Sequence, residues 1–130
     1  MPDFAARIFK TLWFGKAARA ARISNRELYD AARELAKGLG ADLGGNVWKK
    51  RLDKNRHRSI VVSRVGACWI FVYLFAKKDR ENITDLELRA FRKLAKDYSR
   101  LKPAEIDRLV HDGELQEICH GEQTVQKRRP

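Results

Sequence analysis

The chain has 130 residues and a hydrophobic fraction of 44%, which suits one globular domain with one core. Lys and Arg number 28 against 17 Asp and Glu, so the net charge is +11 and favours a polyanionic partner, either nucleic acid or an anionic membrane surface. No apolar run approaches the ~20 residues of a membrane-spanning helix, there is no secretory signal pattern, and the two cysteines fit neither a disulfide framework nor a zinc site. We therefore expect a reduced, cytoplasmic protein without a metal or another cofactor.

Two helices are predicted in the first third of the chain. Residues 4–11 form either a first strand or a lead-in, and Leu12–Arg22 is an Ala-rich, basic stretch typical of a short helix. A capping-box pattern at Ser24–Glu27 predicts the start of a second helix. Its apolar stripe at helical spacing comprises Leu28, Ala31, Ala32, Leu35 and Leu39. Four glycines between residues 38 and 45 end this helix and open a loop.

Three strands are predicted in the middle of the chain. Val47–Leu52 and Ser59–Val65 form a hairpin, which the polar segment Asp53–Arg58 connects. After a turn, Ala67–Ala76 is a continuous apolar run typical of a central strand that is covered on both faces. Cys68 in this strand is expected to be a buried free thiol.

Helices return in the last third. A second capping box at Thr84–Glu87 starts a helix whose apolar face comprises Leu88, Phe91, Leu94, Ala95, Tyr98 and Leu101. Pro103 is placed for the first turn of a short helix over Ala104–His111. We expect an α+β domain over residues 1–121, with a small antiparallel sheet of three or four strands, two N-terminal helices and C-terminal helices. The tail over residues 122–130 is basic at its end and is expected to be disordered.

Strand alternation assigns the basic residues of the first hairpin strand to faces. Trp48 and Leu52 belong on the core side, so Lys49 and Arg51 project together from the other face, about 6–7 Å apart by strand rise. Lys50 shares the core face and is expected to snorkel to its rim. The hairpin thus presents two cations side by side.

Further cations adjoin this pair. Arg58 lies beside the hairpin turn, and Lys77, Lys78 and Arg80 follow the apolar run. With helices packed behind the opposite face, we expect the exposed face of the sheet to form a concave cationic platform that holds phosphates. The alternative is that this charge only solvates the surface.

The sequence gives little support for a metal site or for a Ser/His/Asp catalytic triad. His111, Cys119 and His120 match no zinc-binding spacing. No Ser/His/Asp order and no Gly-rich phosphate loop stands out.

Six stretches in series resemble the RelE/ParE toxin superfamily, and more closely the RelE-like, HigB-type toxins of toxin–antitoxin modules. They are FKTLWF (9–14), ADLGGNVWKKRL (41–52), RSIVVSR (58–64), FVYLFAKKDRENI (71–83), ELRAFRKLAKDY (87–98) and GELQEICHG (113–121). The resemblance implies a small RelE-like domain without a metal that cleaves messenger RNA, typically in the ribosomal A site. It also implies an antitoxin partner, often a helix-turn-helix protein, through which the complex binds operator DNA.

The resemblance also implies site residues. It makes Lys49, Arg51, Arg58, Lys78 and Arg80 the catalytic candidates and Lys77 a candidate for RNA binding. The charge pattern of the hairpin adds Lys50, Lys54, Arg56, His57 and Arg64 as further candidates for RNA binding. Two features depart from the family pattern. The hairpin connection DKNRHR is short, and Ile83 and Thr84 occupy the region where some relatives carry a tyrosine.

The expected reaction is a metal-free transesterification. A ribose 2′-OH attacks the adjacent phosphate, and Arg51 and Arg58 stabilise the charge that builds on its oxygens. Like-charge repulsion favours a neutral lysine, which makes Lys49 a candidate base, while Lys78 or Arg80 assists the leaving oxygen. His57 is the nearby side chain that ordinarily titrates near neutrality. Two other functions stay open, a ParE-like gyrase poison and a non-catalytic basic module that binds RNA or DNA.

Overall fold

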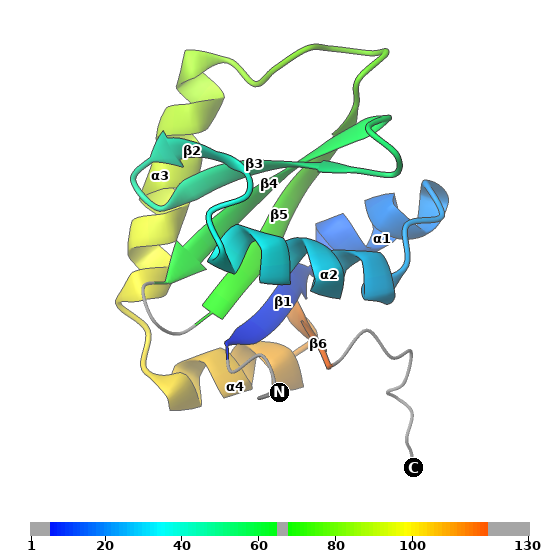
Figure 1. The fold of residues 1–130 in the computed structure, drawn as a ribbon. Coiled ribbons are helices and arrows are strands. Elements are labelled where there is room, and N and C mark those ends of the chain that lie inside the picture. The colour runs from blue at the N-terminus through cyan, green and yellow to red at the C-terminus, as the bar shows by residue number, and fades with distance from the viewer. Residues whose placement is uncertain (1–5, 65–67, 120–130) are drawn as a thin grey trace.

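The computed structural model describes residues 6–64 and 68–119, which form four helices and a six-stranded sheet (Figure 1). In chain order the elements are β1 (Arg7–Thr11), α1 (Leu12–Ala20), α2 (Asn25–Ala36), β2 (Ala41–Gly44), β3 (Val47–Leu52), β4 (His57–Arg64), β5 (Cys68–Ala76), α3 (Asp85–Ser99), α4 (Pro103–His111) and β6 (Leu115–Ile118). The α+β class and the order of the long elements agree with the prediction. The predicted tail lies outside the described residues.

The sheet is larger than predicted, and it is mixed. Its strand order is β2-β3-β4-β5-β1-β6, and β1 runs parallel to β5 while the other neighbours are antiparallel. The expectation of three or four antiparallel strands was therefore wrong. β2 lies in the segment that was expected to be a loop, and β6 lies where no element was predicted, because a four-residue strand carries almost no periodic signal. β6 and β1 lie near opposite ends of the sequence, and they pair with Ile8 opposite Ile118.

Helices cover both faces of the sheet, which corrects the predicted open platform. α1 and α2 pack on one face, in a core cluster that contains Leu52, Val61 and Phe71. α3 and α4 pack on the other face, together with Val47 and Ile60. Figure 1 views the sheet with α2 in front and α3 behind. Consecutive apolar residues in β4 and β5 require this arrangement, because alternate side chains of one strand point to opposite faces.

The two predicted capping boxes differ in the structure. At α3 both bonds are present, since Thr84 Oγ1 accepts from the Glu87 N–H and the Glu87 carboxylate accepts from the Thr84 N–H. At α2 the Ser24 hydroxyl accepts from the Glu27 N–H, but the Glu27 carboxylate accepts from the backbone N–H of Asp53. Glu27 thus ties the start of α2 to the β3–β4 turn.

Two smaller predictions can also be compared with the structure. α2 ends at Ala36, so Leu39 lies past the helix and is 55% exposed, which corrects its assignment to the apolar stripe. Cys68 is buried and free, as expected. Within the described ranges, every helix is too short or too polar to cross a membrane.

Candidate functional site

The hairpin cations lie on the α3 face of the sheet, at the end that α3 leaves uncovered. Arg51 is directly opposite Arg58, and Lys49 is opposite Ile60, which packs in the α3-side core. Opposite residues in an antiparallel pair share a face. The predicted projection of Lys49 and Arg51 from one face is therefore confirmed. The reason for their exposure is different, because α3 buries the start of this face at Val47 and stops short of its other end.

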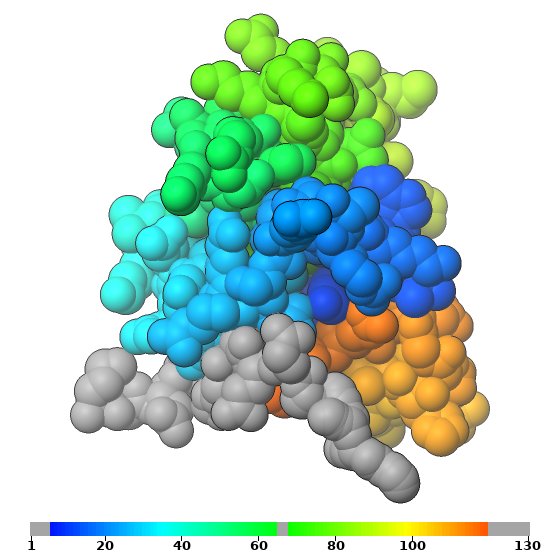
Figure 2. Space-filling model, turned by 90° about the vertical axis from the view of Figure 1, so that its right-hand side faces the viewer, coloured from blue at the N-terminus to red at the C-terminus, as the bar shows by residue number. Residues whose placement is uncertain are grey.

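A cleft of about 700 Å³ lies beside these cations. β3 and β4 line it with Lys49, Lys50, Arg51 and Arg58; residues 39–41 and the segment after β5, with Lys77, Glu81 and Asn82, complete it. The backbone N–H of Lys77 donates to the Arg56 carbonyl over 2.9 Å and ties the two sides together. Figure 1 and Figure 2 show the hairpin tip and the segment that follows β5 at the same end of the molecule. Five cations thus meet one acid, Glu81, around one opening.

Arg58 is the most buried of these cations, with 9% of its surface exposed. Its Nη1 donates to the carbonyls of Asn55 and His57, over 3.1 and 3.2 Å, so the turn holds the guanidinium in place. Its Nε and Nη2 donate to no acceptor among the described residues. A fixed and partly desolvated guanidinium with free N–H groups suits a phosphate oxygen.

The turn that holds Arg58 has an unusual backbone. Asp53, Lys54 and Asn55 have φ angles of 57°, 52° and 72°, three successive left-handed residues. Asp and Asn tolerate this region better than other residues do, whereas a lysine there is strained. Strain of this kind persists where the surrounding structure imposes it.

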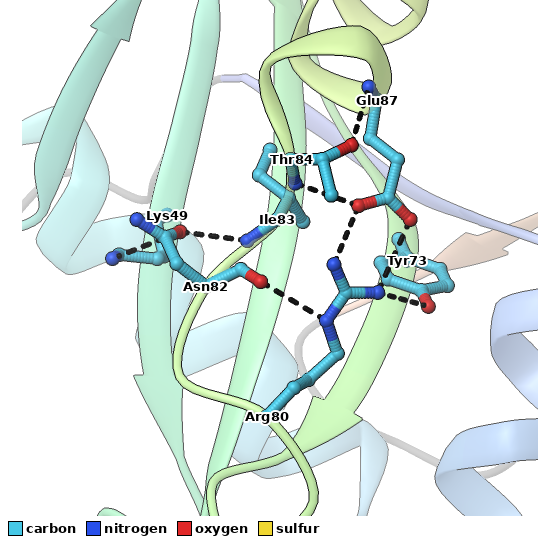
Figure 3. A network of polar contacts seen from close by, with 7 residues as sticks. All are labelled: Lys49, Tyr73, Arg80, Asn82, Ile83, Thr84 and Glu87. Atoms are coloured by element: carbon cyan, nitrogen blue, oxygen red, sulfur yellow. Dashed lines mark hydrogen bonds and ion pairs between the residues drawn. The ribbon is translucent and has the colours of Figure 1, made fainter.

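Lys49 and Arg51 differ in their contacts. Lys49 Nζ donates to the Asn82 side chain over 3.3 Å, and Asn82 in turn accepts from the Ile83 N–H over 2.9 Å (Figure 3). Arg51 is exposed and makes no hydrogen bond or ion pair within the described part of the chain. The lysine is oriented from the opposite wall of the cleft, and the arginine is free to move toward a ligand.

Arg80 is committed to a network within the protein (Figure 3). Its Nη2 and Nη1 donate to the Glu87 carboxylate over 2.6 and 3.1 Å, and its Nε donates to the Asn82 carbonyl over 3.0 Å. It also lies over the Phe75 ring and contacts the Tyr73 hydroxyl. The Arg80 bond and the Thr84 N–H lower the pKa of Glu87 to about 2. Arg80 therefore fixes the segment between β5 and α3, and its three nitrogens are occupied.

Three other candidate residues direct their charge elsewhere: Lys50 lines the cleft but binds acceptors on its α2 side, and His57 and Arg64 lie outside the cleft lining. Lys50 and His57 project from the α1–α2 face: Lys50 Nζ binds Glu34 at 2.6 Å and the Leu39 carbonyl at 2.7 Å, and His57 is opposite the core residue Leu52. Arg64 is at the far end of β4, opposite Cys68 and about 20 Å from Arg58 by strand rise.

The turn residues differ among themselves. Arg56 pairs with Asp53 at 2.8 Å, and this contact, with that of His57 at 3.0 Å, lowers the pKa of Asp53. Lys54 and Lys78 are exposed, at the β3–β4 turn and after β5. Both add positive potential at this end of the molecule.

Two residues that organise the site are absent from the predicted set. Asn82 and Glu87 carry no charge pattern that links them to Lys49 or Arg80, and only the path of the chain between β5 and α3 brings them together. Among the described residues, no group of three or more His, Cys, Asp or Glu side chains is placed to hold a metal ion. The described donors at the cleft are mainly ammonium and guanidinium groups, which suit an anion.

Comparison with known proteins assigns the chain to a family. No curated protein and no solved structure gives a significant match. The family model described as the RelE toxin of the RelE/RelB toxin–antitoxin system matches residues 6–118, from β1 through β6. This match covers all six strands and the whole cationic cleft, so the chain belongs to the RelE toxin family of toxin–antitoxin systems.

Proposed function

We propose that this chain inhibits translation as a metal-free endoribonuclease that cuts messenger RNA in the ribosomal A site. The observation that supports this most is the convergence of Lys49, Arg51, Arg58 and Lys77 on one cleft. Action on ribosomes implies activity in the cytoplasm. The six matching stretches favour the HigB-type subgroup.

The reaction follows from the chemistry of a phosphodiester between positively charged side chains. The ribose 2′-oxygen forms a bond to phosphorus, and the bond from phosphorus to the 5′-oxygen breaks. The products are a 2′,3′-cyclic phosphate and a 5′-hydroxyl. Negative charge grows on the non-bridging oxygens during this step, and fixed guanidinium groups stabilise it more than they stabilise the ground state.

The residues divide the work by their positions. Arg58, which the turn holds, and Arg51, which can follow the substrate, bind the non-bridging oxygens. Lys49 in its neutral form takes the proton of the 2′-OH, and Asn82 orients its Nζ. A protonated lysine of the segment after β5, Lys77 or Lys78, gives a proton to the 5′-oxygen. Arg80 is a positioning residue, because its ion pair with Glu87 holds that segment.

Membership of the family implies a cognate antitoxin as partner. We propose that the antitoxin is a helix-turn-helix protein encoded beside this chain, and that operator DNA is bound through it. The net charge of +11 favours an antitoxin segment that is acidic.

The test is cleavage by the purified chain in a translating extract. Messenger ends are mapped, and the chemistry of the new ends is determined. We expect cuts in phase with codons that leave 5′-hydroxyl ends, and we expect Lys49→Ala and Arg58→Ala to abolish them. Growth arrest with DNA breaks and intact messenger would instead identify a gyrase poison, and binding of RNA without cuts would identify a non-catalytic module.

A further inference from the structure

Trp13 is the one exposed aromatic side chain among the described residues, with 51% of its surface accessible. It lies in the first turn of α1, whose N-cap is the Thr11 hydroxyl, bound by the Phe14 N–H over 3.0 Å. Phe14 is fully buried against Phe71 and fixes the rotation of the helix. The exposure of Trp13 is thus imposed by a well-anchored helix, and the indole is held in one place.

One face of the indole rests on another ring. The rings of Trp13 and Tyr73 are 5.2 Å apart at 23°, a stacked arrangement, and Tyr73 packs further against Phe75 and Phe91. The other indole face has no ring contact within the described residues. A rigid, half-covered indole is a preformed platform for a second flat group, because little conformational entropy is lost on stacking.

α1 packs mainly on the other face of the sheet, but its first turn brings Trp13 to the α3 face, where the cationic cleft lies, because Tyr73 belongs to the α3-side cluster. Lys49 is opposite Ile60, Ile60 is opposite Tyr73, and Trp13 stacks beyond Tyr73. Two strand spacings and the 5.2 Å between the Tyr73 and Trp13 rings separate the ends of this row, about 15 Å in all. Figure 3 shows Tyr73 and Lys49 connected through Arg80 and Asn82.

Among the described residues, the lining of the cleft contains cations but no aromatic side chain. Proteins that hold single-stranded nucleic acid combine a cationic groove with aromatic rings on which bases stack. On the side away from the cleft, Trp13 borders a groove of about 450 Å³ that carries Asp97 and Glu114, whose charges repel phosphate. A strand whose base reaches Trp13 is therefore directed back toward the cleft.

We propose that Trp13 binds a nucleobase of the messenger strand by stacking, a few nucleotides from the phosphate held by Arg58. This inference rests on the proposed function. Every base can stack on an indole, so Trp13 fixes the position of the strand without selecting a particular base. Trp13 then makes the affinity for the strand depend on one base outside the cleft.

The test measures binding of the full chain to ribosomes programmed with a messenger whose A-site riboses are 2′-O-methylated, which blocks the 2′-oxygen. An abasic nucleotide is moved along the messenger one position at a time. For wild type we expect one position at which the missing base weakens binding about 5- to 100-fold. Trp13→Ala should show the same loss with the intact messenger, and no further loss at that position.

Two variants control for folding and for simple apolar contact. Trp13→Tyr keeps a ring and should recover most of the affinity. Leu12→Ala removes the neighbouring apolar side chain, which is 45% exposed, and should bind within about twofold of wild type. Thermal unfolding of each variant is measured alongside.

Three outcomes would overturn the inference: binding of Trp13→Ala equal to wild type, equal losses for Leu12→Ala, or a loss that no abasic position reproduces. Loss of antitoxin binding with RNA binding intact would assign the surface to the protein partner instead. Cleavage of unmodified messenger is assayed separately. If wild type cuts messenger but no abasic position weakens binding, only this inference is rejected. If one abasic position weakens binding but no messenger is cut, only the proposed nuclease activity is rejected.

Discussion

Replacement of Arg58 is the sharpest test of the cationic cleft. Removing one preorganised donor that faces developing charge costs about 10²–10³ in rate, or about 2.7–4 kcal/mol of transition-state stabilisation. Arg58 has the features that justify this range, because it is 9% exposed and two turn carbonyls hold its guanidinium. We therefore expect Arg58→Ala to slow single-turnover cleavage about 100- to 1,000-fold.

Two further variants separate geometry from charge. Arg58→Lys keeps the charge and loses the planar fork, so we expect a loss of about tenfold. Arg64→Ala removes an equal charge from the same strand and the same face, about 20 Å away by strand rise. We expect it to cleave within about threefold of wild type, because exposed charges beyond a Debye length are largely screened.

The assay is single-turnover cleavage on programmed ribosomes, with binding measured separately so that rate and affinity are distinguished. Denaturant unfolding of each variant confirms that it is folded under the assay conditions. Cleavage by Arg58→Ala at nearly the wild-type rate would show that its guanidinium does not stabilise the transition state. An equal loss of rate in Arg64→Ala would show that diffuse positive charge, and not the position of Arg58, explains the activity.

Three other predictions concern the support of the site. Glu87 has its pKa lowered to about 2 from a usual 4.5, so its contribution to stability is complete above pH 4.5 and is lost as the pH falls through 2. The free energy of unfolding, measured at several pH values, should be higher for wild type than for Glu87→Gln at neutral pH, and this difference should vanish as the pH falls from 4.5 to 2. The variant should also cleave more slowly at neutral pH. Asp97→Asn, on the same helix, is the control, and a difference independent of pH would contradict the assignment. Lys54→Gly should raise the free energy of unfolding by about 0.5–1 kcal/mol, because relief of the left-handed strain exceeds the added entropy of glycine; a loss of stability would show that the turn is not strained. If four cations contact phosphates, the slope of log K against log salt is about −2.8 for single-stranded RNA, and Lys77→Ala should reduce it by about 0.7. An unchanged slope would remove Lys77 from the binding surface.

The long elements could be predicted because their signals are local. The capping box at Thr84, the proline at the first turn of α4 and the continuous apolar run of β5 each depend on residues within a few positions of one another. Strand alternation likewise put Lys49 and Arg51 on one face. These features need no knowledge of the rest of the chain.

The role of each individual cation could not be predicted from local sequence signals. Arg80, Lys50 and Arg56 look alike in the sequence, yet each is paired with a carboxylate in the structure. Arg58 looks the same and faces backbone carbonyls with part of its guanidinium free. Whether a cation is free for a ligand depends on which acid the fold brings to it.

The charge, the helices, the β3–β4 hairpin and the face that carries its basic pair follow from the amino-acid order alone, because composition, capping and alternation act over short distances. The fold was needed to establish that β1 pairs in parallel with β5 and that β6 closes the edge, since such pairing joins segments far apart in the chain. It also decided that α3 covers most of the predicted platform and leaves a cleft at one end. The cations converge there because the segment between β5 and α3 is held against the sheet by Arg80 and Glu87.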